Sequence, residues 1–256
     1  MSNEWDFYFC RIDDRPASIM LDLGLAAAVP DPERPWLLSL RLPLQRPRPE
    51  DGLSSSEEAP ALAAVEDLLD AELAAACGAL RAGRLTWNGL RELFYYARAE
   101  GQARAEDCLD RALAAVARAH PDREVLSRTD HDPEWTHYRE FLYPSPGQLQ
   151  WIRDRRVVDQ LRAHGDHLEI PRPVDHYLHF PDAPSRDAFL QSATAAGFRS
   201  EPTPDESTST LPYGAHLVRT DPVDLPHIHD VVLDLIALAE PHAGDYDGWG
   251  APIQRG

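Results

Sequence analysis

The chain contains no lysine: all 25 basic residues are arginines, and they stand against 43 Asp and Glu residues. The formal net charge is −18, and both halves are acidic, with 26 acidic residues and 16 arginines up to Ser145 and 17 and 9 after it. Such a surface repels phosphate backbones and attracts basic partners. The composition therefore favours a basic protein segment over nucleic acid as the partner, although high charge also serves solubility alone.

Cysteine is scarce as well. Cys10, Cys77 and Cys108 are odd in number and form no CxxC pair, so the sequence suggests neither a disulfide framework nor a thiolate zinc site and indicates a reducing compartment. No apolar run approaches the length of a membrane span, and residues 1–6 lack the basic and apolar parts of a signal peptide. We therefore expect a cytoplasmic protein without membrane contact.

Common catalytic motifs are missing too, since no GxGxxG, P-loop, HExxH or GxSxG occurs. The serine clusters at 54–56 and 207–209 lie in segments without a histidine. His227 and Asp230 lie one turn apart on an expected helix, but two ligands without a third do not make a metal site. We expect no enzymatic activity, no cofactor and no metal.

A length of 256 residues with 43% hydrophobic side chains favours two globular domains. In the first half, periodicity and turn residues predict five strands and two helices. The expected strands are 5–11, 18–23, 35–44, 91–97 and 125–129, and the helices are 60–80 and 102–119. From Trp36 onward this order predicts helices on one face of a sheet, which the leading hairpin extends. The proline-rich connector after residue 130 places the boundary between domains 1–145 and 146–256.

The second half predicts a helix at 149–163 and then a strand, helix, strand, strand, helix, strand order. The strands are 174–180, 198–201, 213–219 and the glycine-rich 244–250, the helices are 184–196 and 226–240, and 202–211 is an exposed loop. This βαββαβ order is the ferredoxin-like one, so the fold class is α+β with two sheet-plus-helices units. Both helices on one side leave the other side of the sheet open for binding.

The candidate binding residues lie at this open face and at the last strand. Tyr177 and His179 point away from the side that Val174, His176 and Leu178 share, so we expect His176 to be buried and hydrogen-bonded. An exposed aromatic strand resembles an RNA platform, but such platforms need cations that this half lacks.

Residues 244–250 contain a Tyr and a Trp among three glycines. Such a pattern is typical of a backbone in an unusual conformation with two large aromatic side chains packed beside it. Two interpretations stay open: the rings close the core at a sheet edge, or the strand contacts a partner. The candidate protein-binding residues are Asp245, Tyr246, Asp247, Trp249, Tyr177 and His179.

The second half resembles the RraB family, regulators of ribonuclease E activity. The matching residues run from Leu161 and Gly165-Asp166 through His176, Phe180, Phe189 and Gly197-Phe198 to Leu238-Ala239-Glu240 and Tyr246-Asp247-Gly248-Trp249-Gly250. The match covers about residues 148–251, and its Tyr-Asp-Gly-Trp-Gly element is the most specific part. The resemblance implies a ferredoxin-like fold and inhibition of ribonuclease E by protein contact. Unlike the best-known members, this chain is expected to lack a long acidic C-terminal tail.

The first half is similar to the domain-of-unknown-function 695 family. The residues concerned are Trp5-Asp6-Phe7-Tyr8, Pro35-Trp36-Leu37 and Trp135 to Leu142, and no activity follows from them. The leading hypothesis is a non-enzymatic acidic regulator that binds a basic segment of an endoribonuclease. Two alternatives stay open: an immunity or toxin-neutralising protein, and an RNA-processing or hydrolytic enzyme with a site between the domains.

Overall fold

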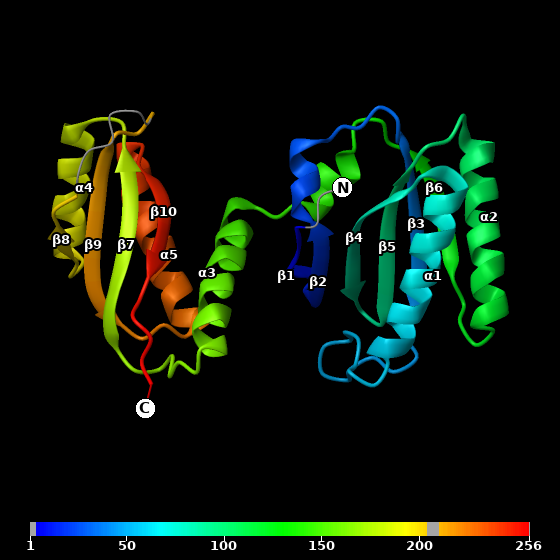
Figure 1. Ribbon diagram of the computed structural model, residues 1–256, viewed down its shortest axis with the longest axis horizontal. Coiled ribbons are helices and arrows are strands. Elements are labelled where there is room, and N and C mark those ends of the chain that lie inside the picture. Colours follow the sequence, from blue (N-terminus) through cyan, green and yellow to red (C-terminus); the bar gives the residue numbers. More distant parts are fainter. Residues whose placement is uncertain (1–3, 204–209, 256) are drawn as a thin grey trace. The chain divides into compact units, whose positions relative to one another are not determined.

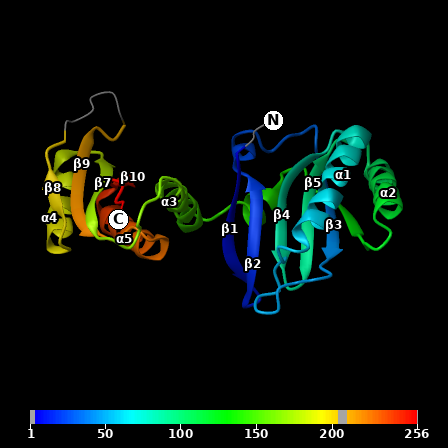
Figure 2. The same cartoon turned by 60° about the horizontal axis from the view of Figure 1, so that its bottom comes forward.

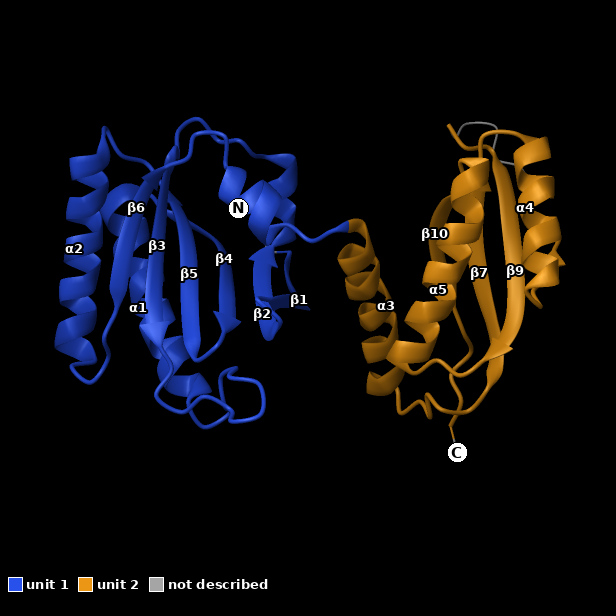
Figure 3. Ribbon diagram, turned by 180° about the vertical axis from the view of Figure 1, so that it is seen from behind, with its two compact units in different colours: residues 1–145 blue, residues 146–256 orange. Residues whose placement is uncertain are grey.

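The structure is a computed structural model that describes residues 4–203 and 210–255. The chain divides into two compact units, Met1–Ser145 and Pro146–Gly256, which Figure 3 colours separately. Residues 204–209 of the loop expected at 202–211, with the second serine cluster, lie outside the described residues. Within the described ranges, no helix combines the length and the apolar character that a bilayer crossing requires.

The N-terminal unit contains a six-stranded sheet in the order β1-β2-β4-β5-β3-β6, and its strand pairs are antiparallel (Figure 1). The elements are β1 (Trp5–Ile12), β2 (Arg15–Asp22), β3 (Trp36–Pro43), α1 (Ala59–Cys77), β4 (Leu80–Trp87), β5 (Leu90–Ala97), α2 (Gln102–Ala119) and β6 (Leu126–His131). Without the β1–β2 hairpin, the succession β3-α1-β4-β5-α2-β6 with β4-β5-β3-β6 in space is ferredoxin-like. The predicted α+β unit with an added hairpin is confirmed.

β4 is the strand that the sequence pattern missed. The expected helix over 60–80 is too long, because α1 ends before Gly78, whose left-handed backbone (φ 57°) stops it, and β4 follows. A bulge in β4 shifts its register against β5, which blurs the alternation expected of a strand. The available signal was Asn88-Gly89: their positive φ values, 46° and 74°, are those of a tight hairpin turn.

The two helices of this unit cover one face of the sheet (Figure 2). Their apolar sides meet the leucines of β3 and the inward residues of β5 in one buried cluster. That cluster includes Leu38, Leu40, Leu42, Leu62, Val65, Leu69, Leu73, Leu93, Tyr95, Cys108, Leu109 and Val116. The helices therefore lie on one side, as the element order predicted, and the opposite side of the sheet needs another cover.

That cover comes from the segment expected to be only a connector. Residues His137–Leu142 form a single π-helical turn, and Trp135, Tyr138 and Leu142 are fully buried. The Trp135 ring stacks on Tyr96, with ring centroids 3.7 Å apart and an interplanar angle of 5°. The segment thus belongs to the unit, and beyond it the sheet face over β3, β5 and β6 carries a pocket.

The C-terminal unit contains a four-stranded antiparallel sheet in the order β10-β7-β9-β8. The elements are α3 (Pro146–Ala163), β7 (Arg172–Phe180), α4 (Ala183–Ala195), β8 (Arg199–Glu201), β9 (Tyr213–Asp221), α5 (Leu225–Ala239) and β10 (Asp245–Gly250). From β7 on, this is the predicted ferredoxin-like βαββαβ order. The core lies between the sheet and its helices, and α3 packs on α5.

Candidate functional site

The candidate residues of the last strand lie beside those of β7. β10 pairs antiparallel with β7, so that Asp245 is opposite His179 and Gly248 is opposite Tyr177. The register shifts at Asp247, which forms a bulge. The fold thus brings together residues about 70 positions apart, as the expected strand order required.

The two rings of β10 point into the core. Tyr246 is 6% exposed and Trp249 is 8% exposed. The hydroxyl of Tyr246 lies 2.8 Å from Nδ1 of His176, which is itself fully buried, and Nε1 of Trp249 donates to Oδ1 of Asp154 at 3.0 Å. Burial lowers the pKa of His176 to about 4, so this imidazole is neutral at pH 7. These rings anchor the strand from inside.

Asp154 joins α3 to the rest of the C-terminal unit. Its carboxylate is almost fully buried and accepts hydrogen bonds from Gln150, Trp249 and His229, at 2.8, 3.0 and 2.8 Å. Burial raises the pKa of Asp154, and the hydrogen bond from His229 opposes that shift most. Three donors from α3, β10 and α5 therefore hold one buried carboxylate.

The open face of this sheet carries the remaining candidate residues. Tyr177 is 40% exposed and stacks on His216, with centroids 4.7 Å apart, and Nε2 of His216 is 2.7 Å from Oδ1 of Asp175. Asp245 and Asp247 are exposed on the edge strand. The structure therefore separates the six candidates into two buried rings and four residues, among them the half-buried His179, that lie at or near the surface.

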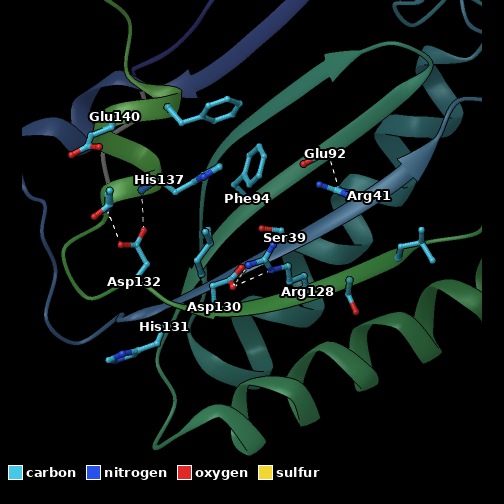
Figure 4. A pocket seen from close by; sticks show the side chains of 15 residues that line it. Ser39, Arg41, Glu92, Phe94, Arg128, Asp130, His131, Asp132, His137 and Glu140 are labelled. Carbon is cyan, nitrogen blue, oxygen red and sulfur yellow. Dashed lines mark hydrogen bonds and ion pairs between the residues drawn. The ribbon is translucent and has the colours of Figure 1, made fainter. Parts of the chain in front are cut away.

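The N-terminal unit also carries a pocket of about 810 Å³ that no sequence pattern indicated (Figure 4). β3, β5 and β6 form its floor, and the π-helical turn forms one wall. Its lining residues are Leu37, Ser39, Arg41, Glu92, Phe94, Leu126, Ser127, Arg128, Asp130, His131, Asp132, Thr136, His137, Glu140 and Phe141. The alternation of Ser39 and Arg41 with leucines indicated a polar face on β3, but no sequence pattern joined it to residues 130–141.

Ion pairs cross the floor of this pocket. Nε of Arg41 lies 2.8 Å from Oε1 of Glu92, and Arg128 donates twice to Oδ1 of Asp130, at 3.0 and 2.6 Å. Glu92 is only 7% exposed, and burial raises its pKa against the opposing effect of Arg41. Both arginines are therefore already matched by carboxylates.

Asp132 fixes the wall. Its carboxylate accepts the hydroxyl of Tyr96 at 2.6 Å and the backbone N–H groups of Thr136 and His137 at 2.8 and 3.0 Å. Burial lowers the pKa of His137, so its ring is neutral near pH 7. The His137 ring is in contact with the rings of Phe94 and Phe141, at centroid distances of 4.4 and 4.8 Å.

The fold and these surfaces define an α+β protein of two compact units, each with a ferredoxin-like order of strands and helices. Within residues 4–203 and 210–255, no three His, Cys, Asp or Glu side chains converge as a metal site requires. Residues 3–143 match the model of a family described as family of unknown function (DUF695). Because this match spans more than half of the chain, the chain belongs to that family.

The C-terminal unit matches a second family model. Residues 151–251 match the model of a family described as regulator of ribonuclease activity B (RraB). Both resemblances drawn from the sequence are confirmed.

No curated protein matches the chain at a significant level. Among solved structures, a crystal structure described as that of a candidate glycine cleavage system transcriptional repressor aligns with 10% identity. The alignment covers 85% of this chain and 98% of the chain of that structure, with a TM-score of 0.23.

Proposed function

We propose that this protein is a non-catalytic regulator that binds a basic segment of an endoribonuclease of the ribonuclease E type and lowers its activity through this protein–protein contact. The match of residues 151–251 to the ribonuclease-regulator family carries this proposal. The net charge of −18 supports a basic partner, since long-range attraction raises the rate at which oppositely charged surfaces meet.

The contact surface in this proposal is the edge of the C-terminal sheet at β10 and the adjoining open face. Asp245 and Asp247 supply exposed carboxylates there, and Tyr177 and His179 supply rings. Tyr246 and Trp249 serve the same surface indirectly, because their buried hydrogen bonds hold the strand that presents the two carboxylates. A basic side chain of the partner would meet the carboxylates, and its apolar stem would lie along the Tyr177 ring.

An inhibition assay tests the proposal. The rate at which the endoribonuclease cleaves a short RNA is measured with increasing amounts of the full-length protein. We expect inhibition that weakens as salt is raised, because exposed charges are screened. Cleavage that is unchanged at saturating protein, with no complex in sedimentation at low salt, would refute the proposal.

Matched variants locate the contact. Asp245→Asn with Asp247→Asn removes two carboxylates from the proposed surface, whereas Asp230→Asn with Asp234→Asn removes two exposed carboxylates from α5. We expect about tenfold weaker inhibition for the first pair and about twofold or less for the second. Equal losses would show that net charge alone attracts the partner and that the surface is placed wrongly.

A further inference from the structure

The pocket on the N-terminal unit has the dimensions of a small-ligand site. Its volume of about 810 Å³ falls within the range of about 300–1,000 Å³ usual for such sites. It opens on the sheet face opposite α1 and α2, where the π-helical turn stops covering the strands. Figure 4 shows Glu92 and Arg41 on one side of Phe94 and His137 on the other.

The charge of the lining favours a cation. Four carboxylates line the pocket, from Glu92, Asp130, Asp132 and Glu140, against two guanidinium groups. Each guanidinium group is already paired with one carboxylate of the lining, so the remaining carboxylates, of Asp132 and Glu140, are in excess. A cation gains from this excess negative charge, which the −10 of the whole unit reinforces.

Aromatic rings line the same pocket. Phe141 is 39% exposed. Its ring contacts that of His137, which in turn contacts that of Phe94. Cations bind over the faces of aromatic rings, and organic cations gain most because they shed water at low cost. The neutral imidazole of His137 does not repel such a ligand.

We propose that this pocket binds an organic cation, an alkylammonium or guanidinium group on a small apolar body, with the excess carboxylates of the lining facing the charge and Phe141 facing the apolar part. The site is independent of the ribonuclease regulation proposed above, since it lies in the other unit. The same chemistry can come from a free amine or from a Lys or Arg side chain of a partner protein.

Calorimetric titration of the full-length protein tests the charge preference. The probes are phenethylamine, its neutral analogue 2-phenylethanol and the anion phenylacetate, all at one ionic strength. We expect phenethylamine to bind at least about tenfold more tightly than either analogue. Tighter binding of phenylacetate, or no heat from phenethylamine at about 10 mM, would overturn the proposal.

Variants tie the binding to the pocket. Glu92→Gln should raise the Kd for phenethylamine about tenfold or more, because it removes one negative charge from the lining and leaves the guanidinium group of Arg41 without its ion pair. Phe141→Ala, at a position where the side chain is 39% exposed, should raise it about three- to tenfold. Asp67→Asn, on the exposed side of α1, is the control and should leave the Kd unchanged. Binding that neither pocket variant weakens would refute this placement.

A peptide arm separates the two sources of the cation. A five-residue peptide with one central arginine and glycine neighbours is titrated beside N-acetylarginine amide. If the peptide binds more tightly than N-acetylarginine amide, and Phe141→Ala weakens that binding, the natural ligand is a side chain of a partner protein. Equal affinity of the two probes supports a free small molecule. A protein that inhibits the ribonuclease but does not bind the amine would refute this proposal alone. A protein that binds the amine but does not inhibit the ribonuclease would refute only the regulatory proposal.

Discussion

Gly244 precedes β10 at a point where the backbone lies against a buried ring. A Cβ added at this position would come within 2.3 Å of Cε1 of Phe180, whereas one added at Gly250 would meet nothing within 4 Å. We expect Gly244→Ala to lower the free energy of unfolding of the C-terminal unit by about 1–3 kcal/mol, because the fully buried Phe180 ring must move.

The measurement is hydrogen exchange of the amides in β7 and α5, which reports the stability of this unit. Gly250→Ala is the control and should change it by no more than about 0.5 kcal/mol. Equal effects of the two substitutions would mean that the loss comes from replacing a glycine in this segment and not from contact with the ring.

The element that depends most on one side chain is α3. It begins the C-terminal unit, and the buried Asp154 ties it to β10 through Trp249. Trp249→Phe removes the N–H that this carboxylate accepts, so we expect a loss of about 2–3 kcal/mol, because hydrogen bonds to charged groups are worth more than neutral ones. Hydrogen exchange of the α3 amides measures the effect.

Trp87→Phe is the matched control, because the indole N–H of Trp87 is buried without a hydrogen-bond partner. Removing a donor that bonds to nothing costs no hydrogen bond and relieves a desolvated group, so this change should be close to neutral for the N-terminal unit. A Trp249→Phe protein whose α3 exchanges at the wild-type rate would show that packing alone holds the helix.

Elements with a strong period were predictable from the sequence, and contacts between distant segments were not. The helices at 102–119 and 149–163 follow from spaced apolar residues, and the order of strands and helices then implies the C-terminal sheet, whereas β4 of the N-terminal sheet was missed. The burial of His176 followed from strand alternation and is confirmed, but its partner Tyr246 is 70 residues away. The pocket could not be predicted for the same reason. Asp132 holds its wall in place, and the carboxylate of Asp132 is bonded to Tyr96, which lies on another strand far from it in the sequence.

At the scale of the whole molecule, each unit has a sheet and a core of its own. We therefore expect residues 1–145 and residues 146–256 to fold as separate proteins, each with one cooperative transition in urea. On the functional proposals above, the first fragment should retain phenethylamine binding and the second should retain inhibition of the endoribonuclease. A fragment 146–256 without a cooperative transition would contradict this division.

A shorter N-terminal fragment tests where the first domain ends. Residues 1–131 contain the six strands and both helices of this unit but omit Trp135, Tyr138 and Leu142, all of them fully buried. Burial of three such side chains is worth about 5 kcal/mol or more, which equals the whole stability of many domains. We therefore expect fragment 1–131 to unfold at much lower urea than fragment 1–145, or to lack a transition. Equal midpoints for the two fragments would show that the π-helical turn is only a connector, as the sequence pattern alone suggested.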